Sequence, residues 1–145
     1  MAKINPYLHF IGNAEEAFNF YKSVFGSEFA MLQRYKDIPN QEGCEGISDA
    51  DKEKIMHVAL PIGDNQVLMA TDAVGKHAED AVIGNNISLS VSAGSKEEAD
   101  KIFNGLAAGG EITMPLSDTF WGDYFGMLQD KFGMRWMVSF NEKYV

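Results

Sequence analysis

One pattern occurs twice in this chain, and the two copies lie about 82 positions apart. Residues 13–26 and residues 95–109 both carry apolar side chains at spacings of three and four, starting at Ala17 in the first copy and at Ala99 in the second. This spacing places the apolar residues on one side of a helix. Each copy is therefore predicted to form an amphipathic helix that packs one stripe against the rest of the protein.

The residues at the ends of both copies fit this prediction. Asn13 and Ser95 are suitable N-caps, and Glu16 and Glu98 are placed to accept a hydrogen bond from the N–H of the cap residue. Glycine suits the left-handed residue that ends a helix. The glycines expected in that role are Gly26 and Gly109.

Each predicted helix is preceded by one strand and followed by three. The predicted strands cover residues 7–11, 28–32, 55–62 and 66–71 in the first half and residues 87–91, 111–114, 126–128 and 134–140 in the second. The chain is therefore predicted to be a single α+β domain over residues 1–145. It is built from two βαβββ modules, module one over about residues 1–72 and module two over about residues 86–145.

Charge and composition limit the partners of this chain. Lys+Arg number 12 and Asp+Glu number 21, which gives a net charge of −9 and argues against a nucleic acid or an anionic membrane surface as the main partner. No apolar run approaches the ~20 residues of a membrane-spanning helix, and no signal peptide is evident, so we expect a cytoplasmic protein. The single cysteine, Cys44, excludes an internal disulfide and is interpreted as a bystander.

Residues 86–93 alternate between apolar and polar side chains, as expected for a half-buried strand. The apolar set is Ile87, Leu89, Val91 and Ala93, and the polar set is Asn86, Ser88, Ser90 and Ser92. The apolar set is expected to face the helix. The polar set is then left open to a ligand.

His57 is the best placed titratable group of the first half. In residues 55–62 the even positions form the heavier apolar set, which puts His57 on the face away from the helix. His57 is either a half-buried structural histidine or a group that contacts a ligand. The alternation of the first strand predicts that His9 lies on the other side and apart from His57.

Four aromatic residues fall within residues 118–126, between two predicted strands. They either close one end of the core or form a lid over a small-molecule pocket, in which Trp121 would offer an unpaired N–H. Trp121, Tyr124 and Phe125 are the candidate ligand contacts of this loop. The methionines, Met69 and Met137 among them, are interpreted as core and pocket lining rather than as thioether metal ligands.

Four motifs together resemble a known family. They are PYLHFIGNAEEA at residues 6–17, KIMH at 54–57, MPLSDTFWG at 114–122 and FGMLQDKFGMRWM at 125–137. They resemble the PhnB-like branch of the vicinal oxygen chelate superfamily, which includes glyoxalase I, extradiol dioxygenases and bleomycin-resistance proteins. The resemblance covers nearly the whole chain. It implies two modules whose curved mixed sheets enclose a cavity, usually completed by homodimerisation.

Metal-dependent members of that superfamily hold an ion with four His, Gln or Glu ligands on the first and last strands of each module. The resemblance places Pro6, Met69, Asn86 and Met137 at those positions, and none of them is such a ligand. We therefore expect no superfamily metal. An off-pattern metal site built from His9, His57 or His77 is the alternative.

Two further implications of the resemblance concern cofactor and ligand. Some PhnB-like sequences carry a methyltransferase description, but this chain has no glycine-rich turn between its first strand and helix to hold S-adenosylmethionine, so no cofactor is predicted. The name PhnB comes from phosphonate-utilisation gene clusters and suggests an anionic ligand. Arg34 and Arg135 are the candidates to bind one.

Two functional hypotheses follow. The first is a metal-free protein that binds a small organic molecule in the cavity between the modules. The candidate ligand-binding residues are His57, Met69, Asn86, Ser88, Ser90, Trp121, Tyr124, Phe125, Arg135 and Met137. The second is a metal-independent enzyme of lyase, isomerase or transferase type, in which His57 is the general base and Asp72 or Asp118 orients it.

Overall fold

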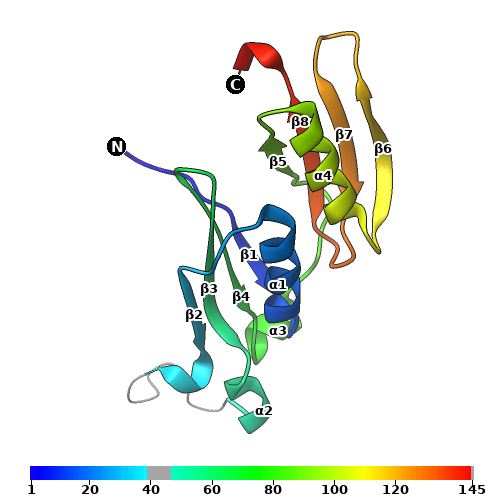
Figure 1. The fold of residues 1–145 in the computed structure, drawn as a ribbon. Helices are drawn as coiled ribbons and strands as arrows, with labels where there is room; N and C mark the ends of the chain where they lie inside the picture. The colour runs from blue at the N-terminus through cyan, green and yellow to red at the C-terminus, as the bar shows by residue number, and fades with distance from the viewer. Residues whose placement is uncertain (39–46, 145) are drawn as a thin grey trace. The chain divides into compact units, whose positions relative to one another are not determined.

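The computed structural model describes residues 1–38 and 47–144, so Cys44 lies outside the described residues. The chain divides into two compact units, Met1–Val82 and Ile83–Val145 (Figure 1). Each unit contains one four-stranded sheet and one helix of 12 residues that packs on it. Within the described residues, no helix is long and apolar enough to cross a membrane.

The first unit holds one copy of the predicted repeat. Its elements are β1 (Tyr7–Phe10), α1 (Ala14–Phe25), β2 (Met31–Arg34), β3 (Ile55–Ile62) and β4 (Gln66–Asp72). The strands form sheet 1 in the order β1-β4-β3-β2, in which β1 and β4 run parallel and the other pairs run antiparallel. The first and last strands of the unit are therefore neighbours.

The second unit repeats this topology. Its elements are β5 (Leu89–Ser92), α4 (Lys96–Ala107), β6 (Glu111–Asp118), β7 (Tyr124–Gln129) and β8 (Arg135–Phe140). They form sheet 2 in the order β5-β8-β7-β6, again with a parallel pair of first and last strands. The α+β fold of two βαβββ modules is thus confirmed.

Four short helical turns lie outside the two repeated units of secondary structure within the described residues. These are η1 (Tyr35–Asp37), α2 (Asp49–Lys52) and α3 (Lys76–Asp80), and η3 (Glu142–Tyr144) follows the last strand. Each spans only three to five residues and buries no side chain that the structure describes. They connect the main elements and add little to either core.

Each core lies between one helix and one face of its sheet. The buried residues of α1 include Ala17, Phe18 and Tyr21, and Phe18 packs edge-on against Phe10 of β1 with ring centroids 6.2 Å apart. The buried stripe of α4 is the predicted one and contains Ala99, Ile102, Phe103 and Leu106. Burial of these apolar side chains is the main force that holds each helix on its sheet.

The start of α1 is capped by a residue from the other end of the unit. Asn13 makes no side-chain capping bond, whereas the Asp72 carboxylate at the end of β4 accepts hydrogen bonds from the N–H groups of Gly12 at 3.0 Å and Ala14 at 2.9 Å. Asp72 is 2% exposed and also accepts the Ile55 N–H at 2.9 Å. The predicted local cap at Asn13 is therefore wrong, because a buried carboxylate from β4 already accepts the N–H of Ala14, the first residue of the helix.

The start of α4 follows the prediction more closely. The Ser95 hydroxyl accepts the Glu98 N–H at 3.0 Å, as an N-cap does. The Glu98 carboxylate, however, accepts the N–H of Gly94 at 2.9 Å rather than that of Ser95. At the other end, Gly26 closes α1 in the left-handed conformation with φ 68°, whereas Ala108 follows α4 and Gly109 takes the positive φ one residue later.

Candidate functional site

Sheet 1 has a face turned away from α1, and we call it the distal face of sheet 1. Its residues are fixed by the strand register, since residues paired across strands share a face. The distal face of sheet 1 consists of Tyr7, His9, Met31, Gln33, His57, Ala59, Pro61, Val67, Met69 and Thr71. His57 and Met69 are thereby placed on one surface, on the side of the sheet where His57 was expected.

Three ring side chains meet on this distal face. The Tyr7 hydroxyl lies 3.1 Å from Nδ1 of His57 and forms a hydrogen bond with it. The Tyr7 ring is tilted against His57 at a centroid distance of 5.7 Å and against His9 at 5.6 Å. Residues from the first and third strands of the module are thus joined across β4, which lies between them in the sheet.

The expectation that His9 lies apart from His57 is wrong. Phe10 packs against Phe18 of α1 and so fixes the helix-facing side of β1, which turns Tyr7 and His9 to the distal face. Apolar side chains occur at even positions of this strand, Leu8 and Phe10, and also at the odd position Ile11. The alternation therefore does not decide which face of the strand packs against the helix.

Both carboxylates proposed as partners of His57 are engaged with other groups. Asp72 faces the helix side and accepts three backbone N–H groups, those of Gly12, Ala14 and Ile55. Asp118 belongs to the second unit and forms an ion pair with Lys96 at 3.0 Å. The hydrogen-bond partner that the structure gives His57 is the phenol of Tyr7.

A second phenol lies near the first. The Tyr35 hydroxyl donates to the backbone oxygen of Asp72 at 2.7 Å and lies 3.3 Å from Oγ1 of Thr71, so it is held at the edge of the distal face. Partial burial, and to a smaller extent the neighbouring Tyr35, raise the pKa of Tyr7 above its usual value. Tyr7 therefore remains a neutral hydroxyl at neutral pH and can donate a hydrogen bond.

The distal face of sheet 2, turned away from α4, gathers several other candidates. Ser90 of β5 lies opposite Met137 of β8, which in turn lies opposite Met127 of β7, and Phe125 lies on the same face two residues along β7. Arg135 also belongs to this face, and its Nε is buried with no hydrogen-bond partner among the described residues. Arg135 is thus a cation that the described part of the chain leaves without a carboxylate.

The other arginine candidate is engaged. Arg34 lies on the helix side of sheet 1 and holds Glu15 of α1 through two nitrogen atoms, at 2.6 Å and 3.2 Å. It also donates to the backbone oxygen of Glu53 at 2.9 Å. The hydrogen bond to the Glu15 carboxylate raises the pKa of Arg34 further. Arg34 is therefore a structural cation that joins β2 to α1.

Two polar candidates of the second unit lie outside the strand predicted for them. The strand β5 begins at Leu89, so Asn86 and Ser88 precede it and are exposed. Ile87, expected to face the helix, is 75% exposed. The alternating pattern of residues 86–93 thus begins three residues before the strand does.

The aromatic loop is built differently from the expected lid. The indole N–H of Trp121 is not unpaired, because it donates to the Asp123 carboxylate at 2.9 Å. Tyr124 points to the helix side, where its hydroxyl bonds Asp100 and its ring lies under the Lys96 ammonium. Phe125 takes the opposite side and contacts the Trp121 ring at 5.9 Å. Trp121 and Phe125 therefore remain together, whereas Tyr124 belongs to another surface.

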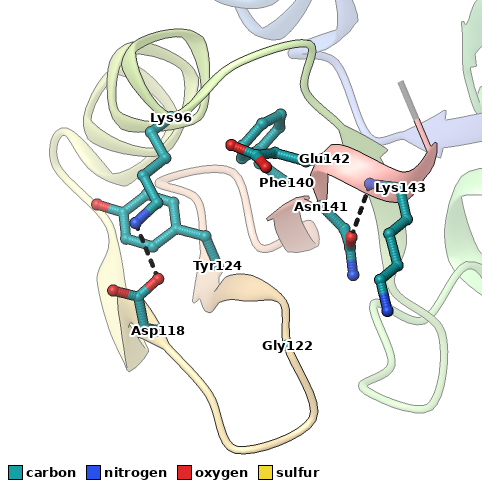
Figure 2. Close-up of a pocket in the computed structure, with 8 residues that line it drawn as sticks. All are labelled: Lys96, Asp118, Gly122, Tyr124, Phe140, Asn141, Glu142 and Lys143. Atoms are coloured by element: carbon teal, nitrogen blue, oxygen red, sulfur yellow. Dashed lines mark hydrogen bonds and ion pairs between the residues drawn. The ribbon is translucent and has the colours of Figure 1, made fainter.

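That other surface contains a pocket of about 320 Å³ within the second unit (Figure 2). It is lined by Lys96, Asp118, Gly122, Tyr124, Phe140, Asn141, Glu142 and Lys143. Lys96 pairs with Asp118 across the pocket, and the Asn141 side chain is held between Asp123 and the Lys143 N–H. The side chains of Lys96, Asp118, Tyr124 and Asn141 are thus already engaged, with one another or with Asp100 and Asp123. Only Asp118, Gly122 and Tyr124 came from the segment that the sequence singled out, and no motif marks the residues after β8.

The donor set for a metal ion is poor on both distal faces. On the neighbouring first strands, the residue paired with Met69 is Tyr7 rather than Pro6, and the residue paired with Met137 is Ser90 rather than Asn86. Neither Tyr7 nor Ser90 is a His, Gln or Glu ligand of the kind that the superfamily metal needs. His9 and His57 supply two imidazoles to the distal face of sheet 1, and His77 lies exposed on α3. Within residues 1–38 and 47–144, no three His, Cys, Asp or Glu side chains are grouped to hold a metal.

Comparison with known proteins agrees with the resemblance of the sequence. Residues 2–139 match the family described as 3-demethylubiquinone-9 3-methyltransferase. Protein PA1353 from Pseudomonas aeruginosa is 38% identical, with a TM-score of 0.83 and coverage of 97% of this chain and 98% of that one. A putative 3-demethylubiquinone-9 3-methyltransferase, the PhnB protein from Bacillus cereus, is 32% identical, with a TM-score of 0.76 and coverage of 96% and 99%.

A more distant structure shows the fold alone. A glyoxalase/bleomycin resistance protein/dioxygenase family enzyme from Burkholderia phytofirmans is 17% identical, with a TM-score of 0.61 and coverage of 92% of this chain and 95% of that one. The likeness therefore extends to the wider glyoxalase-like group. The chain belongs to the PhnB-like 3-demethylubiquinone-9 3-methyltransferase family.

Proposed function

We propose that this PhnB-like protein of the glyoxalase superfamily binds a small organic molecule without the superfamily metal, in a cavity that includes the distal faces of its sheets. The proposal extends to the expected shared cavity of the two modules and to a homodimer. The observation that carries it is the Tyr7–His57 hydrogen bond on the distal face of sheet 1, beside Met69 at a position where metal-dependent relatives need a ligand.

The composition of that surface supports binding rather than a purely structural role. A distal face made only for packing would be apolar, yet this one carries two imidazoles, a phenol, an amide and a hydroxyl among its methionines. A few placed polar groups within an otherwise apolar surface are typical of small-molecule sites. Ser90, Phe125, Arg135 and Met137 supply the same mixture on the distal face of sheet 2.

The family's description names a methyltransferase, and the residues here do not fit S-adenosylmethionine in the turn after the first strand. That turn contains one glycine, Gly12, and the Asp72 carboxylate already accepts the N–H groups of Gly12 and Ala14 at the start of α1. A second anionic group would meet the buried charge of Asp72 there. No step of the proposed function uses this cofactor.

Thermal unfolding in the presence of a metabolite panel tests the proposal, with the protein treated with a chelator and then assayed with and without added nickel or zinc. A ligand at one hundred times its Kd stabilises the folded state by about 2.7 kcal/mol, which gives a measurable rise in Tm. We expect at least one compound to stabilise the metal-free protein. Stabilisation that appears only after metal is added would contradict the proposal, and so would a panel without any stabilising compound.

The alternative is a metal-independent enzyme of lyase, isomerase or transferase type with His57 as general base. The hydrogen bond between Tyr7 and Nδ1 leaves Nε2 of His57 as the atom that can meet a substrate. For any substrate that the protein turns over, His57→Gln is expected to lower kcat by a factor of about 100 or more, in line with the usual contribution of a general base. Turnover that is unchanged in this variant would remove His57 from the reaction, and His77→Gln on α3 is the matched control.

A further inference from the structure

The distal face of sheet 1 differs in charge from the rest of the chain. The protein has 21 Asp and Glu residues and a net charge of −9, yet none of the strand residues on this face is acidic. Its titratable side chains are those of Tyr7, His9 and His57. In a strongly acidic protein, a sheet face without carboxylates is one on which an anion meets no like charge at contact distance.

We propose that this face binds a planar organic anion, such as an aromatic or conjugated carboxylate, whose oxygen atoms accept hydrogen bonds from Tyr7 and His57. The inference rests on the proposed function, since it names the ligand class of the same surface. It goes further by assigning Tyr7 as the second hydrogen-bond donor of the site.

The hydrogen-bonding capacity of the Tyr7–His57 pair supports an anion. With a neutral imidazole, one of the two protons serves the bond between the Tyr7 oxygen and Nδ1, and the pair has one N–H or O–H left to donate. With an imidazolium, Nδ1–H donates to the Tyr7 oxygen, and both Nε2–H and the Tyr7 O–H can donate outward. Protonation thus raises the number of outward donors from one to two, which suits the two oxygens of a carboxylate.

No neighbouring charge competes for this imidazolium. From β1 it faces Tyr7 and His9, from β2 it is paired with Gln33, and Thr71 lies on the same face of β4. Tyr35 stands at the edge of the face with its hydroxyl on the backbone oxygen of Asp72, and the Asp72 carboxylate itself is turned to the helix side. A positive charge on His57 therefore has no acidic partner on these elements and can be met by the ligand.

The apolar part of the face suits a flat ligand. The methionines at the centre and edge of the sheet, Met69 and Met31, lie in one row with Tyr7 and Ala59, and Met31 is 47% exposed. Thioether groups make favourable contacts with aromatic rings. Ala59 lies between Met69 and Met31, and its small side chain leaves space above the sheet at that point. A ring can lie over this row while its carboxylate reaches Tyr7 and His57.

The experiment compares benzoate with benzamide, two flat molecules of nearly the same shape that differ in charge. The protein has three histidines, so NMR signals of the imidazole Hε1 protons report on His9, His57 and His77 separately once each is assigned by a His→Gln variant. At about pH 6 we expect benzoate to shift the His57 and His9 signals and to bind about tenfold more tightly than benzamide. Raising the pH to about 8 should weaken benzoate binding several-fold and leave benzamide unchanged.

Two variants assign the donors. Tyr7→Phe keeps the ring and removes the hydroxyl, and it should weaken benzoate about tenfold at pH 6, because a hydrogen bond to a charged group is lost. Ser23→Ala, which removes an exposed hydroxyl from α1, is the control and should bind benzoate as the parent protein does. Equal affinities for benzoate and benzamide, or a Tyr7→Phe variant that binds benzoate normally, would overturn the proposal.

The two proposals fail in different ways. If compounds of the metabolite panel stabilise the metal-free protein but benzoate does not move the His57 signal, the anion site is wrong and the binding function stands. If no compound of the panel stabilises the protein and neither probe shifts a histidine signal, both are wrong. A shift of His77 equal to that of His57 would show that benzoate binds histidines in general, and it would also overturn the anion site.

Discussion

The Asp72 carboxylate accepts the backbone N–H of Ala14 at 2.9 Å, so the last strand of the first module caps the helix that follows its first strand. The same side chain accepts the N–H groups of Gly12 and Ile55. Three donors from three parts of the module converge on one buried carboxylate. These bonds link the turn after β1, the start of α1 and β3 to the end of β4. They also explain why the Asp72 carboxylate does not orient the His57 ring.

Replacing this carboxylate with an amide should destabilise the first module. Asp72→Asn keeps the size of the side chain but puts an NH₂ group where the structure needs an acceptor for backbone N–H groups, so at least one buried donor is left unpaired. We expect a loss of about 3 kcal/mol in the free energy of unfolding, measured by urea denaturation. Asp64→Asn in the exposed turn between β3 and β4 is the control and should change stability by less than about 0.5 kcal/mol. Equal stability of Asp72→Asn and the control would show that the three bonds contribute little.

Gly126 is required by packing in the second module. A Cβ at this position would lie 2.8 Å from Cα of Leu116 and 2.8 Å from Cε2 of Phe103, and the first of these is backbone that cannot move aside easily. Gly126→Ala should therefore cost about 1–3 kcal/mol by overpacking. Gly84→Ala, whose Cβ would meet nothing closer than 3.6 Å, is the matched control in a loop of the same unit. A Tm of Gly126→Ala within 1 °C of the Gly84→Ala value would contradict this packing argument.

The two arginines considered for anion binding should differ when each is replaced by methionine. Arg34→Met removes a two-pronged contact with Glu15 and a bond to the Glu53 backbone, and we expect a loss of about 1–2 kcal/mol because the pair is partly exposed. Arg135→Met removes a cation whose Nε has no partner among the described residues, so the change should be neutral or stabilising. Urea denaturation of both variants gives the comparison. A larger loss for Arg135→Met than for Arg34→Met would show that Arg135 has a structural role.

The stability of the protein at alkaline pH should depend on the hydroxyl of Tyr124. Its hydrogen bond to Asp100, with smaller effects from desolvation and from the charges of Asp100 and Asp118, raises the pKa of the phenol in the folded protein. A raised folded-state pKa of an acid means that its stabilisation is complete below the unfolded pKa of about 10 and is lost as the pH rises through the folded value. The parent protein should therefore lose more stability than Tyr124→Phe between about pH 9 and pH 11. Parallel slopes for the two proteins, followed by chemical denaturation at each pH, would contradict this assignment.

Much of the fold followed from local patterns in the sequence. The repeated helix spacing predicted α1 and α4, and the turn at residues 63–65 between two apolar runs predicted β3 with the bounds that the structure gives. These features depend on side chains within one or two turns of each other. The strand order of each sheet does not follow from these patterns, because it depends on the pairing of the first strand with the last one.

The candidate site was harder to predict, because it depends on which face of a strand meets the helix. The sheet face that carries His57 was predicted correctly, because its neighbours Val58 and Leu60 are large apolar residues that face the helix. Both are fully buried in the structure. The side of His9 was not, since the contact between Phe10 and Phe18 decides it and no local pattern reveals that contact. The bond between Tyr7 and His57 joins residues 50 positions apart, and the pairing of Trp121 with Asp123 hides an N–H that looks unpaired in the sequence.

The parallel pairing of the first and last strands in each sheet also affects the order in which the protein can fold. In the first module the capping bond from Gly12 to Asp72 spans 60 positions, and the parallel pairing of β1 with β4 is equally distant in sequence. A helix of 12 residues has little stability alone in water. During synthesis α1 must therefore wait until residue 72 has emerged, and non-local closure of this kind is slow. A chain shortened before β4 would lose the helix together with the strand, so each module is expected to form in one late cooperative step.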